Sequence, residues 1–403
     1  MKFWVSLKNH VSIIGLGYVG LPLAVAAAKS GYTVIGIDLD EDKVNRINQG
    51  VSPIADIKNI QIAELVSAGS LKAKSNFNSI KDAEVIIICV PTPLLKTKLP
   101  DLSYLERAAE SIKDHLSEGS LVILESTVAP GTTRNYLAPL LQPARNVAET
   151  TIDLAFSPER IDPANQYWHI ENTPKIVAGL TSESRKRTVD FYSKFIDKIV
   201  ECESLEVAET AKLLENSFRL INISFINEIS IFCQKLGVDV NLVIKAAATK
   251  PYGFMPFFPS LGVGGHCIPV DPLYLSNKAL EIGAPTKLID LAAQLNQEMP
   301  QYYVEKAEEK LVGLKGKKIL VVGVSYKPNV SDVRETPVEA LIAGLNQKGA
   351  QVFWHDELVK EWNGENSVPL GNDYDLAILA TPHDYLEMSK LGNVPILNTR
   401  GVI

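Results

Sequence analysis

Cysteine and histidine are scarce in this sequence, which has 4 cysteines and 6 histidines among 403 residues. No two cysteines form a CxxC pair, and all four stand far apart: Cys89, Cys202, Cys233 and Cys267. This spacing argues against a zinc site and against a disulfide framework, and it favours a reducing compartment. Five histidines also have no partner at the spacing of metal ligands: His10, His115, His169, His355 and His383. We therefore predict no metal site, and we expect these histidines to be solvated or to serve in packing.

An excess of basic charge is absent as well. The net charge of −7 gives no basic footprint for nucleic acid. An anionic ligand would therefore need local cations.

Long apolar runs are missing except at residues 11–28, where three glycines and Pro22 interrupt the run. We expect neither a membrane span nor a signal peptide there, and we predict a soluble, cytoplasmic protein with no membrane or nucleic-acid partner.

The same apolar segment carries the pattern of a dinucleotide site. An apolar strand (residues 11–14) leads into Gly15-Leu16-Gly17-Tyr18-Val19-Gly20, and a helix and a second strand that ends at Asp38 follow. Gly15 and Gly17 would let a pyrophosphate approach the helix amino end, and Gly20 would let the helix pack on the strand. Asp38 would accept hydrogen bonds from a ribose and repel a 2′-phosphate. The pattern favours NAD over NADP.

The order of elements predicts an α/β protein with two Rossmann-like doubly wound domains that are joined by a long central helix. Apolar strand-like runs at 85–90, 121–124 and 176–178 alternate with helical patterns. A long amphipathic helix is expected between residues 203 and 237. A second nucleotide-fold pattern has strands at 318–323, 352–355 and 375–380. We expect three domains, at 1–202, 203–300 and 301–403.

A single cysteine stands in the glycine-rich segment Gly264-Gly265-His266-Cys267, and the carboxylate of Asp271 follows four residues later. A thiolate there could attack a carbonyl carbon, while Asp271 handles a proton or a water molecule. A buried structural cysteine is the alternative interpretation, since cysteine is often buried.

Seven motifs in order make the sequence resemble the UDP-glucose/GDP-mannose dehydrogenase family. They are GLGYVGLP (15–22), VPTP (90–93), ESTVAPGTT (125–133), SPER (157–160), EVAETAKLLEN (206–216), GGHCIPVDP (264–272) and GVSYKPNVSDVRETP (323–337). The resemblance implies an NAD-dependent enzyme that oxidises the C6 alcohol of a nucleotide sugar to a carboxylate in two steps. It also implies a homodimer formed through the central helix.

The resemblance further implies a role for each matching residue. Cys267 would be the nucleophile, Lys212 and Asn216 would contact the reacting oxygen, and Glu159 would be the acid/base. Asp271, with Thr127 and Lys212, would position the hydrolytic water. Thr92, Pro93, Thr127 and Arg334 would contact NAD, in addition to the glycine turn with Tyr18 and Val19. Lys327, Phe258 and Gly264 would contact the UDP-sugar, as would Glu159, Lys212 and Asn216. The alternatives are a turn-stabilising role for Glu159, a helix cap for Asp271, a capping or surface position for Asn216, and solvated positions for Lys212 and Lys327.

The sugar depends on the loop at residues 250–259, whose GFMPFFP run resembles the branch that acts on UDP-N-acetylglucosamine. The UDP-N-acetylmannosamine branch tends to carry a basic residue in this loop, and none lies between Lys250 and Cys267. UDP-N-acetylgalactosamine, UDP-N-acetylmannosamine and UDP-glucose stay open as alternative substrates. So do two other classes, a two-electron dehydrogenase of the 6-phosphogluconate type that needs no Cys267, and a sensor that binds NAD and a nucleotide sugar without turnover.

Overall fold

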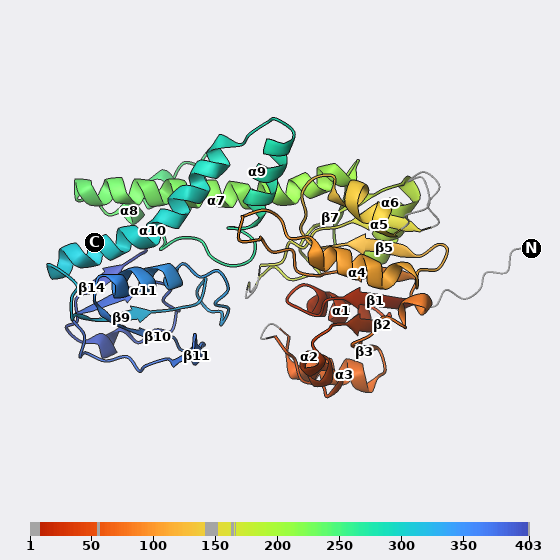
Figure 1. Cartoon of the computed structure of the whole chain (residues 1–403), viewed down its shortest axis with the longest axis horizontal. Coiled ribbons are helices and arrows are strands. Elements are labelled where there is room, and N and C mark those ends of the chain that lie inside the picture. Colours follow the sequence, from red (N-terminus) through yellow and green to blue (C-terminus); the bar gives the residue numbers. More distant parts are fainter. Residues whose placement is uncertain (1–8, 55–56, 142–151, 163–164, 166, 402–403) are drawn as a thin grey trace, which may run out of the picture. The chain divides into compact units, whose positions relative to one another are not determined.

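The chain divides into two compact units, Met1–Leu214 and Glu215–Ile403. A computed structural model describes residues 9–54, 57–141, 152–162, 165 and 167–401 (Figure 1). Among these described residues, no helix combines the length and the apolar character that crossing a membrane requires. The predicted division into three domains stays a prediction.

The first unit is built on an eight-stranded sheet in the order β3-β2-β1-β4-β5-β6-β7-β8 (Figure 1). Its strands are β1 His10–Ile14, β2 Thr33–Ile37, β3 Leu71–Lys74, β4 Val85–Ile88, β5 Leu121–Leu124, β6 Asp153–Phe156, β7 Lys175–Gly179 and β8 Ile199–Glu201. All neighbouring pairs are parallel except β6 and β7, which are antiparallel. The first six strands have the order of a dinucleotide-binding fold, in which ligands bind beyond the carboxyl ends of the strands.

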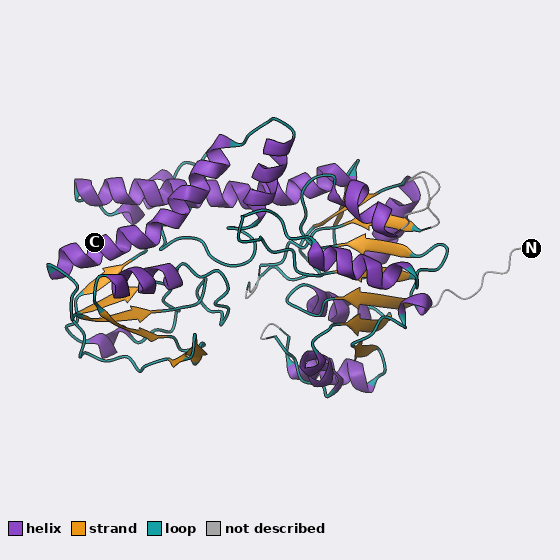
Figure 2. Ribbon diagram, viewed as in Figure 1, coloured by secondary structure: helices purple, strands orange, loops and turns teal. Residues whose placement is uncertain are grey.

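Helices cover both faces of this sheet (Figure 2). They are α1 Gly20–Lys29, α2 Glu41–Asn48, α3 Asn59–Ser67, α4 Ser103–Lys113, α5 Ala138–Leu141 and α6 Ser182–Tyr192. Along β4, Val85 and Ile87 belong to one buried cluster while Ile86 and Ile88 belong to the other. Because successive side chains of a strand point to opposite faces, fully apolar strands feed two cores. This confirms the doubly wound architecture.

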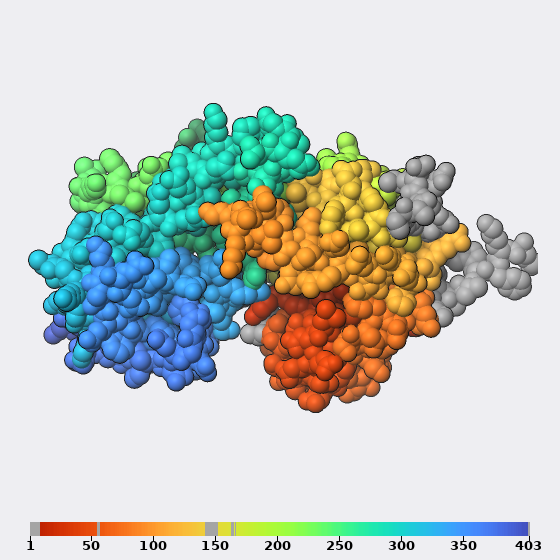
Figure 3. Space-filling view, viewed as in Figure 1, coloured from red at the N-terminus to blue at the C-terminus, as the bar shows by residue number. Residues whose placement is uncertain are grey.

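Four helices precede the second sheet: α7 Leu205–Leu236, α8 Val240–Ala247, α9 Asp271–Glu281 and α10 Lys287–Leu311. Helix α7 confirms the long helix expected at 203–237, and the boundary between the two units falls within it. Helix α10, cyan in Figure 3, lies at the surface of the second unit, where Leu288 and Leu291 are more than half exposed.

The second unit contains a parallel sheet in the order β10-β9-β13-β14. Its elements are β9 Lys318–Val322, α11 Val338–Gln347, β10 Gln351–His355, β13 Leu376–Leu379 and β14 Ile396–Asn398, and β11 Glu361–Trp362 and β12 Glu365–Asn366 form a separate two-stranded sheet. Ile319 and Val321 pack into a core with α10 and α11, whereas Leu320 and Val322 pack against the segment around Leu391. The two faces again feed two cores, so the second Rossmann-like domain is confirmed.

Candidate functional site

A pocket of about 650 Å³ lies at the carboxyl ends of β1, β2 and β4. It is lined by Ile14, Gly15, Gly17, Ile37, Asp38, Leu39, Asp40, Lys43, Phe77, Cys89, Val90, Pro91, Tyr104, Arg107, Ala108, Glu110 and Ser111. This is the position at which a doubly wound sheet binds the adenosine half of a dinucleotide. The residues present fit that half of NAD, because apolar side chains line much of the cavity and the Asp38 carboxylate at the end of β2 is among its lining groups.

The three glycines of the first turn differ in what surrounds them. A Cβ on Gly15 would lie 2.6 Å from the carbonyl oxygen of Cys89, and the φ of Gly15 is +91°. A Cβ on Gly20 would lie 1.8 Å from the carbonyl oxygen of Gly15. The Cβ position of Gly17, by contrast, has no atom of the described residues beyond its chain neighbours within 4 Å. The structure thus requires Gly15 and Gly20 for close packing of the chain on itself and leaves open space beside Gly17. Val19 directly precedes α1 at its amino end.

The carboxylate of Asp38 ties the second strand to the glycine turn. Its Oδ2 accepts a hydrogen bond from Leu16 N–H at 2.8 Å and forms an ion pair with Lys43 Nζ, also at 2.8 Å. Its Oδ1 accepts from Asp40 N–H at 3.0 Å. Asp38 is therefore held in place before any ligand binds.

Other predicted cofactor residues lie outside the lining of this pocket. Tyr18 lines a separate cavity of about 390 Å³ beside α1. Thr92 and Pro93 directly follow Pro91, which does line the adenosine pocket. The sequence analysis missed Tyr104 and Arg107, which line the pocket from α4 and form a cation–π contact at 4.7 Å. Their spacing of three residues on a helix was the available signal.

Thr127 and Glu159 follow β5 and β6, two adjacent parallel strands. Both side chains therefore lie at the carboxyl edge of the same sheet. The carboxylate of Glu159 accepts a hydrogen bond from Ile161 N–H, which is the turn-stabilising contact considered as the alternative for this residue.

A buried polar network lies beneath this edge. The Glu125 carboxylate pairs with Lys175 Nζ at 3.1 Å and accepts a hydrogen bond from the Tyr192 hydroxyl. Lys175 Nζ also donates to Pro158 O at 3.4 Å, directly before Glu159. Burial raises the pKa of Glu125, and burial likewise raises the pKa of the Cys89 thiol nearby. The sequence analysis missed this network, because its members stand far apart in the chain.

Helix α7 carries two of the predicted catalytic residues, Lys212 and Asn216, one turn apart. Both are buried, with exposed fractions of 7% and 5%, so the alternative of surface positions is wrong for these two residues. One turn before Lys212, the buried Glu209 accepts hydrogen bonds from Gly131 N–H at 2.6 Å and Thr133 N–H at 2.9 Å. This carboxylate holds the segment after Thr127 against the helix.

Asn216 and Asp271 are brought together in the second unit, although 55 residues separate them. Asn216 Nδ2 donates to Asp271 Oδ2 at 2.6 Å, and Asp271 is 3% exposed. Cys267 precedes Asp271 by one helical turn, and Asp271 N–H donates to Cys267 O at 2.8 Å. Cys267 is exposed, so the alternative of a buried structural cysteine is wrong.

The glycines before Cys267 pack against the segment 323–337. A Cβ on Gly264 would lie 2.6 Å from Glu335 O, and one on Gly265 would lie 2.9 Å from the ring of Tyr326. Gly265 N–H also donates to Arg334 O at 3.1 Å. These glycines therefore admit a close approach by the chain itself. The segment that carries Lys327 and Arg334 lies directly on the turn that leads to Cys267.

The loop before the cysteine turn presents several large apolar side chains to solvent. Tyr252, Met255 and Phe258 are more than half exposed. Phe257 is half-buried and packs edge-on against Phe218 of α7, with ring centroids 5.7 Å apart. Phe258, a predicted substrate contact, is thus available at the surface of this unit.

Known protein families match the chain over nearly its whole length. Residues 9–196 match the NAD binding domain of the UDP-glucose/GDP-mannose dehydrogenase family, residues 206–298 match its central domain, and residues 320–403 match its UDP binding domain. The chain belongs to this family. The resemblance inferred from the seven motifs is confirmed, as is NAD as the cofactor.

Individual relatives differ in the sugar that their names give. The chain is 36% identical over 395 residues to a UDP-N-acetyl-D-glucosamine 6-dehydrogenase of Pseudomonas aeruginosa, with 95% of this chain and 92% of the relative covered. It is 32% identical to a UDP-N-acetyl-D-mannosamine dehydrogenase of Methanocaldococcus jannaschii, with 98% and 93% covered. The solved structure of a UDP-D-ManNAc dehydrogenase of Pyrococcus horikoshii has a TM-score of 0.90 and 31% identity, with 98% and 96% covered.

The family membership makes the chain an NAD-dependent UDP-sugar dehydrogenase with a UDP binding domain.

Proposed function

We propose that this enzyme oxidises the C6 hydroxyl of a UDP-N-acetylhexosamine, UDP-N-acetylglucosamine in the first place, to the uronic acid through covalent intermediates on Cys267. The observation that carries the proposal is the exposed Cys267, one turn before the buried pair of Asp271 and Asn216. A lone structural cysteine would need neither the exposure nor the paired polar groups.

The chemistry divides into two oxidations and one hydrolysis. When bound, NAD accepts a hydride in each oxidation, so each sugar yields two NADH. The Cys267 sulfur attacks the C6 carbon of the aldehyde and forms a thiohemiacetal, and its oxidation leaves a thioester. Water then breaks the carbon–sulfur bond and releases the carboxylate and the thiol. The covalent bond to Cys267 keeps the aldehyde from escaping.

Lys212 and Asn216 are the proposed stabilisers of the oxygen on C6. They stand one turn apart on α7, and both are buried. A cation and an amide N–H directed at a developing oxyanion typically contribute a few kcal/mol each, about 3 to 4 for one donor. The hydrogen bond from Asn216 to Asp271 would fix the orientation of both groups.

Asp271, Thr127 and Glu159 complete the proposed set. Asp271 would hold the hydrolytic water and accept a proton from it. Thr127 would help to position that water and would also contact NAD. Glu159 would act as acid/base through Oε2, while Oε1 keeps the hydrogen bond from Ile161 N–H.

The 250–259 loop supports an N-acetylated sugar. Its exposed Tyr252, Met255 and Phe258 offer apolar surface that suits an acetamido methyl group better than a bare hydroxyl. Lys250 lies over the ring of Tyr252 at 5.0 Å, and no lysine or arginine follows it before Cys267. UDP-N-acetylmannosamine is the second candidate substrate, favoured by the similarity to the Pyrococcus horikoshii enzyme.

The test is NADH release by the purified enzyme with UDP-N-acetylglucosamine, its galactose and mannose epimers, and UDP-glucose, with NADH counted per sugar consumed. Two NADH per sugar with UDP-N-acetylglucosamine, at the highest kcat/KM of the four, would support the proposal. A preference for the mannose epimer would transfer the function to the second candidate. Tight NAD binding without turnover on any of them would favour a sensor.

We also propose a homodimer through α7. Phe218, Phe225, Phe232 and Leu236 repeat at intervals of seven, seven and four residues, and each is at least 44% exposed. Such a stripe is the pattern that pairs two helices. Light scattering after size-exclusion chromatography should give twice the chain mass. Phe225→Glu should give a monomer, whereas Lys235→Glu on the same helix should not. A monomeric wild-type enzyme would refute the proposal.

A further inference from the structure

The first turn of each nucleotide fold has the same hydrogen bonds. Gly15 N–H donates to Ile37 O at 2.7 Å, and Gly323 N–H donates to His355 O at 2.8 Å. The next residue in each copy donates to a carboxylate at the end of the second strand. Leu16 N–H bonds Asp38 at 2.8 Å, and Val324 N–H bonds Asp356 at 2.9 Å. The two sheets thus present one glycine and one aspartate in equivalent positions.

The two aspartates differ in what they face. Asp38 lines the adenosine pocket. The Asp356 side chain is fully buried, and its oxygens accept from Val324 N–H, Leu358 N–H and Val359 N–H, each at 2.9 Å, and from His383 Nε2 at 3.0 Å. Three backbone N–H groups and the His383 ring therefore bind the Asp356 carboxylate, whereas its counterpart Asp38 lines a pocket.

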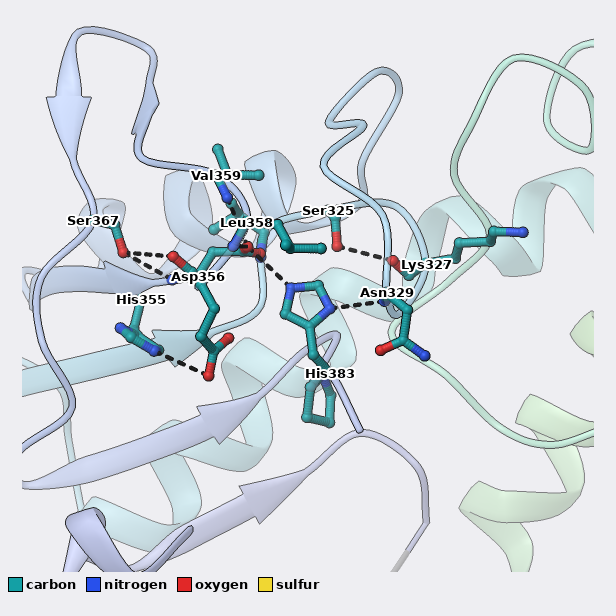
Figure 4. Close-up of polar contacts among 12 residues, drawn as sticks. Ser325, Lys327, Asn329, His355, Asp356, Leu358, Val359, Ser367 and His383 are labelled. Atoms are coloured by element: carbon teal, nitrogen blue, oxygen red, sulfur yellow. Dashed lines mark hydrogen bonds and ion pairs between the residues drawn. The ribbon is translucent and has the colours of Figure 1, made fainter. Parts of the chain in front are cut away.

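The tautomer of His383 follows from its two partners. Asn329 N–H donates to His383 Nδ1 at 2.8 Å, so Nδ1 is an acceptor and the proton of the neutral ring sits on Nε2, which donates to Asp356 (Figure 4). Asp356, Glu357 and His383 have ligand atoms within 4.8 Å of one another. These hydrogen bonds leave no lone pair of His383 for a metal ion. His383 is buried and stacks on Tyr385, which agrees with the expected packing role, and both of its ring nitrogens also form specific hydrogen bonds.

Asn329 links His383 to the segment that carries Lys327. Its backbone has φ +65°, and its side chain donates to Asp384 Oδ2 at 2.7 Å and accepts from Asp384 N–H at 3.2 Å. Ser325 Oγ donates to Lys327 O at 2.9 Å within the same turn. Figure 4 shows the Lys327 side chain extending away from His383. Hydrogen bonds from Asn329 and Ser325 thus fix the turn, and the Lys327 side chain extends from it on the side away from His383.

We propose that His383 is a positioning residue for UDP binding: its neutral ring holds Asn329 N–H, and through this bond it sets the position of Lys327. The inference rests on the proposed contact between Lys327 and the UDP-sugar. It also connects to the cysteine turn, since the 323–337 segment packs on Gly264 and Gly265. His383 itself touches no substrate atom in this account.

Two amide variants separate the two bonds of the ring. His383→Asn places an amide oxygen near the position of Nδ1 and can still accept from Asn329 N–H. His383→Gln places an amide nitrogen near the position of Nε2 and keeps only the bond to Asp356. The readouts are the Kd of UDP by calorimetry, which needs no turnover, and the KM of the UDP-sugar beside kcat and the KM of NAD.

We expect His383→Gln to raise the Kd of UDP and the KM of the sugar by about tenfold, the effect of one lost hydrogen bond. Its kcat and its KM for NAD should stay within about twofold, and His383→Asn should restore the Kd to within about threefold of wild type. His355→Gln is the matched control, because His355 bonds Val368 O and not the Lys327 turn. It should leave the Kd of UDP unchanged.

A double-variant cycle supplies the second test. If His383 acts through Lys327, His383→Gln should add nothing to the Kd of UDP once Lys327→Ala is present. Equal effects of the Asn and Gln variants on Kd, or additivity with Lys327→Ala, would overturn the proposal. A wild-type enzyme that binds UDP but oxidises no sugar would refute the proposed function alone, and one that binds no UDP would refute both.

Discussion

Replacing Lys175 with Met should destabilise the first unit strongly, because it leaves a buried carboxylate without its cation. The side chains of Lys175 and Glu125 are 7% and 1% exposed, and their charged atoms are 3.1 Å apart. Solvent cannot compensate either charge at such burial. Removing one partner of a buried ion pair costs about 3–5 kcal/mol, which corresponds to a fall in Tm of roughly 6–20 °C for a unit of this size.

The pair can be dissected with two further variants. Glu125→Gln should cost a similar amount, because it leaves the Lys175 ammonium buried. The double variant removes both charges while the amide oxygen of Gln can still accept from the Tyr192 hydroxyl. Its cost should therefore lie about 2 kcal/mol or more below the sum of the two single costs.

The effect of Lys175→Met should also depend on pH. Burial raises the pKa of Glu125, and Lys175 opposes that rise, so its removal raises the pKa further. A carboxyl group whose pKa is raised in the folded state contributes stability below pH 4.5, its ordinary pKa. That contribution is lost as the pH rises through the raised pKa of the folded state. The Tm gap between the variant and the wild type should widen from about pH 5 to about pH 8.

Differential scanning fluorimetry of the four proteins over that pH range is the assay, with circular dichroism to confirm that each variant is folded. If Lys175→Met lowers the Tm by less than about 2 °C, or if the double variant loses as much stability as the two single variants together, the ion pair does not stabilise the first unit.

Three further outcomes are expected. Gly15→Ala should lower the Tm and abolish NAD binding, because its Cβ would overlap a carbonyl oxygen at 2.6 Å; Gly31→Ala, with similar φ and open space around it, should keep NAD binding. Asp38→Asn should raise the KM of NAD by about 10- to 100-fold, the effect of a lost charged hydrogen bond. In initial-rate assays, the variant should also show a smaller preference for NAD over NADP than the wild type. The hydrogen bond from Arg134 lowers the pKa of Glu206 from 4.5 to about 2. The contribution of this pair to the stability of the fold is therefore fully present above about pH 4.5, and it is lost as the pH falls through about 2. In thermal melts, the Tm gap between wild type and Glu206→Gln should therefore close between about pH 5 and about pH 2, and a constant gap would contradict this.

The sequence predicted the elements whose residues repeat with a regular period. The strand expected at 85–90 is Val85–Ile88, and the helix expected at 203–237 is Leu205–Leu236. The glycine turn was also predictable, because only glycine fits where a Cβ would meet a carbonyl oxygen. At Gly264, where we predicted a contact with the UDP-sugar, the chain itself makes the close approach.

The periodicity of the sequence could not predict contacts between residues that are far apart in the chain. The bond from Asn216 to Asp271 joins residues 55 apart, and the bond from Tyr192 to Glu125 joins residues 67 apart. In the sequence, His383 has no partner at the spacing of metal ligands. Its partners in the structure, Asp356 and Asn329, lie 27 and 54 residues away. Such pairs depend on the order of strands in the sheet, which brings the ends of separate strands together.

Covalent catalysis on Cys267 can be tested in a single-turnover reaction of the Cys267→Ser variant and the wild type with UDP-N-acetylglucosamine and excess NAD. The wild type should give two NADH per sugar and a uronic acid product. The variant should give at most one NADH and no uronic acid, because the aldehyde then has no sulfur to bind. Two NADH and full product from Cys267→Ser would rule out a required thioester on Cys267.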